Sequence, residues 1–164
     1  MRDHMQEHPD PEAGAVAMCA RLGERLVRLH RSLAVAESLT GGMLCSALAR
    51  TSDAGSFFRG GIVAYASEVK YAVLGVSRGP VVSETAARQM AAAALRMFGA
   101  DISVALTGAG GPDGQDGQPP GTVFVAVATR AGEQVQRHAF AGSPQQVCES
   151  ARDTAVQALL THVQ

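Results

Sequence analysis

Five short apolar runs alternate with segments of helical periodicity, and this alternation limits the chain to a small set of folds. The runs lie at residues 32–37, 60–65, 101–106, 122–129 and 135–140, and their lengths are typical of buried strands. Helical patterns or helix-start signals occur at 13–31, 40–49, 67–74, 83–98 and 143–163. The predicted class is α/β: a single three-layer α/β/α domain with a mixed central sheet.

The segments between these elements predict how the strands connect. Only Ala131-Gly132 and a few polar residues separate the last two strands, so we expect them to form an antiparallel hairpin. Residues 51–58 and 107–121 are rich in polar residues and glycine, and both are predicted to be loops.

The length and charge of the chain exclude several classes of protein. A chain of 164 residues is of single-domain size, and we expect a flexible N-terminal tail over 1–12 and one domain over 13–164. The net charge of −1 argues against nucleic-acid binding. No apolar run reaches about 20 residues, and the start of the chain is polar and acidic, so we expect a cytoplasmic protein without membrane contact. The three cysteines lie far apart, which argues against a disulfide framework or a metal site.

The first motif is AESLTGG at 36–42, which joins the first strand to the second helix. Such a junction exposes backbone N–H groups and the positive end of a helix dipole, which can hold an anion or stabilise an oxyanion. The hydroxyl of Ser38 could act there as a nucleophile. The alternative is that Ser38 or Thr40 only caps the helix, which is the commoner role for such residues.

The second motif is YASEVK at 65–70, which holds the only lysine of the chain; the other 13 of its 14 basic residues are arginine. Lys70 is expected in the first turn of a short helix, where partial burial would lower its pKa. A lysine can lose its proton, so Lys70 is a candidate general base and Tyr65 a candidate proton relay. The alternatives are an exposed lysine and a core tyrosine. Ser67 and Lys70 also form a Ser-x-x-Lys pair, but the second lysine of penicillin-binding proteins is missing.

The third motif is TGAGGP at 107–112, directly after the strand at 101–106. A glycine-rich turn in this position is where α/β folds bind phosphate. It is neither a Walker loop nor a dinucleotide fingerprint, because no Gly-Lys-Ser/Thr and no helix follow it. Taken alone, it is also compatible with a flexible loop.

In this order, the three motifs resemble the C-terminal domain family of the competence/damage-inducible protein CinA. The resemblance covers nearly the whole chain, through AESLTGG at 36–42, FFRGGIVAYASEVK at 57–70, LGV at 74–76, VSE at 82–84, ALTGAGGP at 105–112 and PGTVFVA at 120–126. It implies a compact α/β/α domain that forms a homodimer.

The stand-alone members of this family include nicotinamide mononucleotide deamidases, which release ammonia to give nicotinate mononucleotide in NAD salvage. The resemblance implies that Ser38 is the nucleophile, Lys70 its base and Tyr65 an assisting group, with no metal or cofactor. We therefore expect Ser38 Oγ within hydrogen-bond reach of the Lys70 amine. The candidate contacts to the small nucleotide substrate are Glu37, Thr40, Gly41, Gly42, Thr107, Gly108, Gly110 and Gly111.

The chain departs from the family pattern at the start of the last helix. The family carries Gly-Asp-Arg followed by Val-Arg-Arg, whereas this chain reads GSPQQVCE at 142–149. Cys148 and Glu149 therefore replace arginines that would hold a substrate phosphate. Two alternatives to the deamidase follow: a non-catalytic relative that binds a nucleotide or a protein, and a serine amidase that acts on an uncharged carboxamide.

Overall fold

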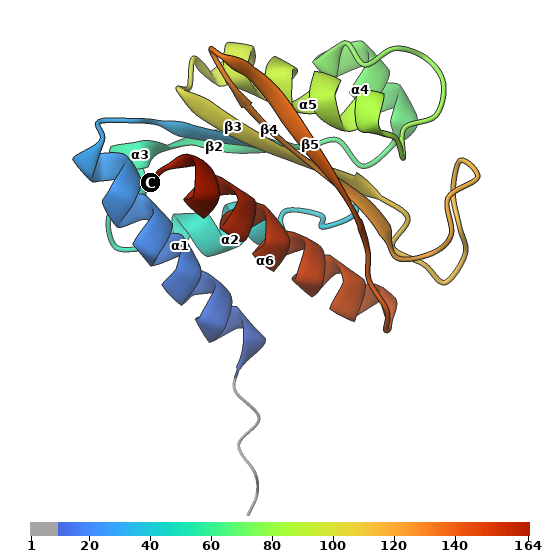
Figure 1. Cartoon of the computed structure of the whole chain (residues 1–164), viewed down its shortest axis with the longest axis horizontal. Helices are drawn as coiled ribbons and strands as arrows, with labels where there is room; N and C mark the ends of the chain where they lie inside the picture. Colours follow the sequence, from blue (N-terminus) through green and yellow to red (C-terminus); the bar gives the residue numbers. More distant parts are fainter. Residues whose placement is uncertain (1–9) are drawn as a thin grey trace, which may run out of the picture.

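The computed structural model describes residues 10–164, and most of the predicted tail, residues 1–9, lies outside this range. The described chain forms one α/β domain (Figure 1). Its elements are α1 (Pro11–Arg28), β1 (Leu33–Glu37), α2 (Met43–Ala49), α3 (Ala54–Phe57), β2 (Phe58–Val63), α4 (Ser67–Leu74), α5 (Glu84–Phe98), β3 (Ile102–Gly108), β4 (Thr122–Thr129), β5 (Gly132–Ala139) and α6 (Pro144–His162).

The five strands form one mixed sheet in the order β2-β1-β3-β4-β5. Strands β2, β1 and β3 are parallel to one another, whereas β4 runs antiparallel to both β3 and β5. The pair β4 and β5 is the predicted hairpin, with Thr129 opposite Gly132 across its turn. The predicted mixed sheet is therefore confirmed.

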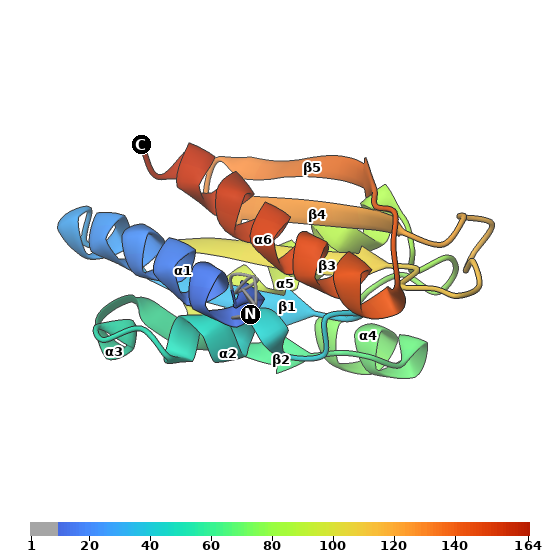
Figure 2. The ribbon, with the colours of Figure 1, turned by 90° about the horizontal axis from the view of Figure 1, so that it is seen from below.

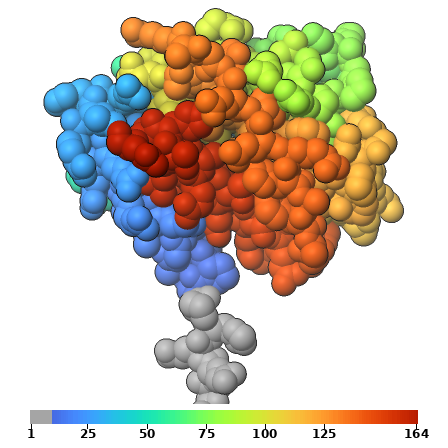
Figure 3. All heavy atoms as spheres, viewed as in Figure 1, coloured from blue at the N-terminus to red at the C-terminus, as the bar shows by residue number. Residues whose placement is uncertain are grey.

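Helices cover both faces of this sheet, which confirms the three layers. Helices α1, α2 and α6 pack on one face, and α5 with α4 lies on the other (Figures 1 and 2). In Figure 3, the red atoms of α6 lie between blue α1 and the orange hairpin strand β5. No helix within residues 10–164 combines the length and hydropathy that a membrane crossing requires.

The two faces of the sheet differ in side-chain size. The face toward α1 and α6 carries large aliphatic residues: Leu33, Val35, Ile102, Val104, Leu106, Val123, Val125 and Val127. The face toward α5 is mostly alanine: Ala34, Ala36, Ala105, Ala126 and Ala128. Helix α5 is itself rich in buried alanine, and it approaches closely enough for Ser103 Oγ to donate to the Ala91 carbonyl oxygen at 2.6 Å.

Several boundaries differ from the sequence-based prediction, among them β2, which spans Phe58–Val63 instead of 60–65. Helix α1 begins at Pro11, with the Asp10 side chain as its N-cap, so the last two residues of the predicted tail belong to the domain. The predicted loop at 51–58 contains the short helix α3, which buries Phe57 in the core. Strand β5 begins at Gly132, three residues before its apolar run, because its backbone pairs with β4 as far as the turn.

The start of α1 is fixed by a buried arginine on α6. The side chain of Arg152 is fully buried and donates to Glu12 Oε1 at 2.7 Å, to Asp153 Oδ1 at 2.8 Å and to the Pro11 carbonyl oxygen at 3.2 Å. Burial without these carboxylates would be costly, since a buried guanidinium needs partners. Arg152 therefore ties the first turn of α1 to α6.

Candidate active site

The three sequence motifs meet because each of them follows a parallel strand. Ser38 directly follows β1, Tyr65 comes two residues after β2, and Thr107 lies at the end of β3. The carboxyl ends of parallel strands lie at one edge of a sheet. Strand β1 is flanked by β2 on one side and by β3 on the other, so the chain reverses direction across the sheet at β1. Such a switch point is where α/β proteins bind ligands.

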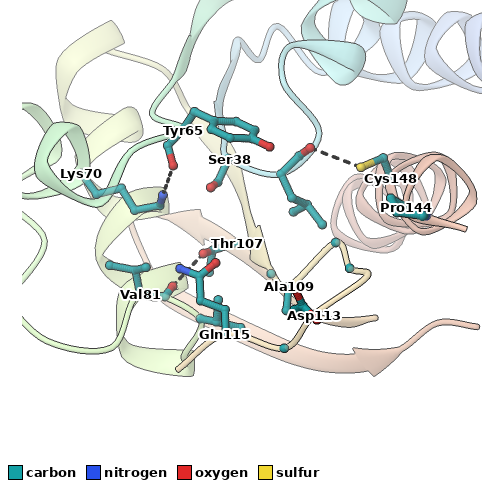
Figure 4. A pocket seen from close by; sticks show the side chains of 16 residues that line it. Ser38, Tyr65, Lys70, Val81, Thr107, Ala109, Asp113, Gln115, Pro144 and Cys148 are labelled. Atoms are coloured by element: carbon teal, nitrogen blue, oxygen red, sulfur yellow. Dashed lines mark hydrogen bonds between the residues drawn. The ribbon is translucent and has the colours of Figure 1, made fainter. Parts of the chain in front are cut away.

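A pocket of about 220 Å³ opens at this edge (Figure 4). Its wall includes Ser38, Tyr65 and Lys70, so the structure brings the three predicted catalytic residues together. The remaining wall is formed by Leu39, by Val81 and Val82, by Pro144 and Cys148 on α6, and by Thr107–Gly111 with Asp113–Gln115 from the glycine-rich loop.

Lys70 is only 1% exposed although it carries an ionisable amine. It shares the inner face of α4 with Leu74, one turn further along the helix. Burial lowers the pKa of Lys70, while the charge of Asp116 acts in the opposite direction and raises it. The predicted fall in pKa is therefore confirmed. A lysine with a lowered pKa is suited to act as a base.

The Lys70 amine does not make the expected hydrogen bond to Ser38. It donates instead to the Tyr65 carbonyl oxygen at 3.0 Å, and Ser38 Oγ has no hydrogen-bond partner within the described chain. Figure 4 shows the amine and the Ser38 hydroxyl directed toward the same space. The Tyr65 ring lies over Ser38 with its hydroxyl on the Cys148 side of the pocket, so it is the backbone of Tyr65 that contacts the lysine.

Glu37 is fully buried and serves the start of α2 rather than the pocket wall. Its Oε1 accepts hydrogen bonds from Thr40 Oγ1 at 2.6 Å and from the Leu44 N–H at 3.1 Å, and its Oε2 accepts from the Cys45 N–H at 2.9 Å. The carboxylate thus takes the place of an N-cap side chain, which Gly42 lacks. It occupies N–H groups that sequence reasoning left open for an anion.

Half of the predicted substrate contacts therefore lie off the pocket. Glu37, Thr40, Gly41 and Gly42 are absent from its wall and instead shape the turn after Ser38. Neither Ser38 nor Thr40 caps α2 through its hydroxyl, so the capping alternative is wrong for both. The other predicted contacts line the pocket, and their role toward a substrate stays a prediction: Thr107, Gly108, Gly110 and Gly111.

The glycine-rich loop is held in place by an aspartate that sequence reasoning missed. Asp116 Oδ2 accepts hydrogen bonds from the N–H groups of Val81 and Val82, at 2.8 and 2.9 Å. Its backbone has a φ of +53°, a value uncommon for a residue other than glycine. Thr107 Oγ1 adds a third link by donating to the Val81 carbonyl oxygen at 2.6 Å. Asp116 therefore joins two walls of the pocket and places a carboxylate close to Lys70.

Two glycines of the TGAGGP motif have different structural roles. A Cβ at Gly108 would lie 2.7 Å from the Thr122 carbonyl oxygen, so only glycine fits beside β4 there. A Cβ at Gly110 would meet nothing closer than Leu39 at 3.9 Å, so this glycine faces the open pocket. The N–H groups of Leu39, Gly110 and Gly111 have no acceptor within the described residues, and they are available to a ligand.

No arginine lines the pocket among residues 10–164, and its charged residues are Lys70 and Asp113. Cys148, at one of the positions where the family pattern has arginine, donates its thiol to the Leu39 carbonyl oxygen at 3.2 Å. Burial raises the pKa of this thiol, which therefore stays protonated. Glu149 lies off the pocket wall and accepts a hydrogen bond from Gln145.

Fold and site together define a single-domain α/β protein with a pocket at the switch point of a mixed sheet. The profile of the CinA C-terminal domain matches residues 16–163. The chain belongs to this family, the C-terminal domain family of the competence/damage-inducible proteins.

The curated relatives include a protein of similar length to this chain and proteins that are much longer. Protein YdeJ of Escherichia coli is 36% identical over 152 residues, which are 89% of this chain and 86% of YdeJ. A CinA-like protein of Geobacter sulfurreducens is 41% identical over 117 residues, which are 68% of this chain and 28% of that protein. The chain thus spans less than a third of the longer relatives.

Solved structures of the family share the whole architecture. A CinA superfamily protein from Klebsiella pneumoniae superposes with a TM-score of 0.88 at 34% identity, over 91% of this chain and 97% of that one. A superfamily protein from Escherichia coli gives a TM-score of 0.87 at 35% identity, over 92% and 90% of the two chains.

Proposed function

We propose that this protein is a serine amidase that hydrolyses the carboxamide of nicotinamide mononucleotide to nicotinate mononucleotide and ammonia. The observation that carries this proposal is a buried lysine of lowered pKa in the same pocket as a serine whose hydroxyl has no partner in the described chain. A serine becomes a nucleophile when a neighbouring base takes its proton. Stand-alone relatives with the matching serine, tyrosine and lysine motifs include deamidases of this nucleotide.

In the proposed reaction, Ser38 Oγ bonds to the carboxamide carbon and its proton passes to the Lys70 amine. The tetrahedral intermediate then loses ammonia as the C–N bond breaks, with the nitrogen taking the proton from Lys70. Water adds to the resulting ester, Lys70 accepts its proton, and the C–O bond to Ser38 breaks as that proton returns to Oγ. The free N–H groups of Leu39, Gly110 and Gly111 are candidate donors to the oxyanion.

The hydrogen bond from Lys70 to the Tyr65 carbonyl oxygen fits a base that acts when substrate is present. Catalytic hydrogen bonds are often long or absent before substrate binds. The Tyr65 contact holds the amine at the pocket wall and uses only one of its N–H groups. The lone pair of the neutral amine stays free to accept the proton of Ser38. The Tyr65 hydroxyl, which faces the Cys148 side, is suited to contact the substrate rather than the lysine.

A second candidate is an amidase for an uncharged carboxamide, and the wall of the pocket favours it. The wall carries no guanidinium within the described residues, and Asp113 adds a carboxylate. An anionic substrate would then depend on backbone N–H groups for its phosphate. The corresponding nucleoside keeps the positive charge of the pyridinium ring but lacks the phosphate, so it tests whether the phosphate is needed, as a nucleotide amidase requires and this second class does not.

The test is ammonia release from nicotinamide mononucleotide and from its nucleoside by the purified protein. We expect turnover of the mononucleotide and a loss of about 10²–10⁴-fold in Ser38→Ala and in Lys70→Arg, since arginine keeps the charge but cannot act as a base. A higher kcat/KM for the nucleoside would select the second candidate. No turnover of either compound would refute both.

Ser67→Ala is the matched control. Ser67 stands three residues before Lys70 on α4, yet it does not line the pocket. The proposal requires that Ser67→Ala keeps the activity of the unchanged protein. If instead Ser67→Ala were inactive and Ser38→Ala active, the nucleophile would be misassigned.

We further propose that the protein forms a homodimer through the apolar surface beside the pocket. Four large side chains of mainly apolar surface are exposed at the end of β2, in the segment after it and on α4: Val63 (43%), Tyr65 (70%), Val69 (37%) and Val73 (47%). Sedimentation should give a dimer, and Val73→Asp should give a monomer because a carboxylate would then be buried without a partner. A monomer at high concentration would refute this assembly.

A further inference from the structure

A second concave surface lies at the opposite end of the sheet from the Ser38 pocket. It is formed around the beginnings of β1 and β3, which lie at the left in Figure 1. It consists of two hollows of about 450 and 520 Å³ that share Arg31 and Asp101. His30 and Arg59 line the first hollow, and Arg130 and His162 line the second. We name this surface the amino-end groove, because β1 and β3 begin there. None of its lining residues belongs to the Ser38 pocket.

The amino-end groove has more positive than negative charge. Three guanidiniums, those of Arg31, Arg59 and Arg130, face one carboxylate, that of Asp101. Asp101 is engaged by the N–H and the hydroxyl of Ser32, both at 2.8 Å, and lies 4.0 Å from Arg130. Within residues 10–164, neither Arg31 nor Arg59 forms an ion pair within 4.0 Å, and Arg31 acts on Asp101 only from a longer distance, where its charge helps to lower the pKa of that carboxyl. Two positive charges therefore remain unmatched.

Nine arginines of the described chain lie outside the groove, and four of them are paired with a carboxylate. Arg50, Arg78, Arg88 and Arg152 each contact a carboxylate. The net charge of the whole chain is −1, so the surplus in the groove is a local feature and not a property of the composition. The groove thus differs from the Ser38 pocket, which has no guanidinium on its wall.

The dipole of α1 does not account for this surplus. Cations near a helix C-terminus are stabilised within its last turn, and Arg25 and Arg28 occupy that turn. The arginines of the groove come from other segments: Arg31 precedes β1, Arg59 lies in β2, and Arg130 lies in the turn between β4 and β5. Separate parts of the chain thus converge on one hollowed surface.

His30 occupies a backbone position that glycine usually takes. It follows the C-cap of α1 with a φ of +52° and donates its N–H to the Val27 carbonyl oxygen, while the Arg31 N–H bonds to that of Leu26. This is a Schellman motif, in which a left-handed residue other than glycine costs about 1–2 kcal/mol. Glycine would avoid this strain but would leave the position without a side chain. His30 instead places an imidazole at the edge of the groove.

We propose that the amino-end groove binds a small anion with two or more linked phosphate groups, at a site separate from the Ser38 pocket. Guanidiniums match phosphate oxygens as paired donors. Arg31 lines both hollows, Arg59 lines one and Arg130 lines the other, so the two hollows together present three guanidiniums to a ligand that spans them. A single phosphate would occupy only one hollow.

The probe for this site is inorganic tripolyphosphate, measured by isothermal titration calorimetry at low salt. We expect saturable binding, and we expect Arg31→Gln and Arg59→Gln each to weaken it by about tenfold or more, since each removes a charge-assisted contact. Arg21→Gln is the matched control. It removes the same charge from an exposed residue of α1 outside the groove, and binding should change by less than about twofold.

Asp101→Asn supplies a test of opposite sign. Removal of the one carboxylate should tighten tripolyphosphate binding, whereas damage to the fold would weaken it. In the unchanged protein, amide resonances of His30, Arg31 and Arg59 should shift on titration, and those of Gly110 and Gly111 should not.

Four outcomes would overturn the proposal: no saturable binding, equal losses in Arg21→Gln, shifts confined to Gly110 and Gly111, or binding of a single-stranded oligonucleotide without binding of tripolyphosphate.

Discussion

Replacement of Arg152 by alanine tests how the start of the domain is held. Arg152 is fully buried, and its guanidinium makes three hydrogen bonds, two of them to carboxylates. Hydrogen bonds to charged groups contribute about 1.5–3 kcal/mol each, and the lower end applies because Glu12 and Asp153 are about 40% exposed. With the volume lost from the core, Arg152→Ala should lower the free energy of unfolding by about 3–5 kcal/mol.

Thermal and urea unfolding both measure this loss. For a domain of this size, 1 kcal/mol corresponds to about 2–4 °C, so the midpoint should fall by about 6–20 °C. Arg78→Ala is the control, because it breaks the exposed pair with Glu68 and should cost less than about 1 kcal/mol. Equal losses in Arg152→Ala and Arg78→Ala would refute the argument that burial makes the Arg152 contacts strong.

Three further predictions concern residues described above. Because the pKa of Lys70 is lowered in the folded state, the unfolded state binds its proton more tightly, and stability rises with pH from the folded pKa up to about 10.5. Lys70→Met should remove this rise in urea unfolding at pH 7 and 10; an unchanged pH dependence would contradict it. Asp116→Asn should lower the pKa of Lys70 further, measured by NMR of ¹³C-lysine-labelled protein, in which the one lysine gives one signal. Asp113→Asn, in the same loop, is its control. His30→Gly should raise the melting temperature by about 2–4 °C as about 1 kcal/mol of backbone strain is relieved; Arg31→Gly, which relieves no positive φ, should not.

The strands and the positions of the three motifs at strand ends were predictable from the sequence because both depend on local patterns. Alternating apolar runs and helix signals locate the elements, and Ser38, Tyr65 and Thr107 each stand where a strand ends. Parallel pairing then brings these ends together, whatever the detail of the turns. The hairpin at Arg130 and Ala131 was equally local, since only a tight turn fits between its strands.

Other contacts were not predictable because they join residues far apart in the chain. Arg152 meets Glu12 across 140 positions, and Asp116 meets Val81 across 35. Glu37 did carry a signal: a carboxylate at the end of an apolar strand, a few residues before a helix without a capping side chain, is a candidate for the cap itself. Sequence reasoning gave that carboxylate to the substrate instead.

The alanine face of the sheet has a mechanical consequence for the pocket. Alanine has no side-chain rotamers, so α5 packs on the sheet without losing side-chain entropy. For the same reason, the alanine face has no flexible side chain that could move to accommodate a larger residue. Two added methyl groups there, as in Ala91→Val, would push the whole helix away from the sheet. The segment that leads into α5 carries Val81 and Val82, which line the pocket and bond to Asp116. A change of volume on the far side of the sheet would thus alter the width of the pocket, without contact with any ligand.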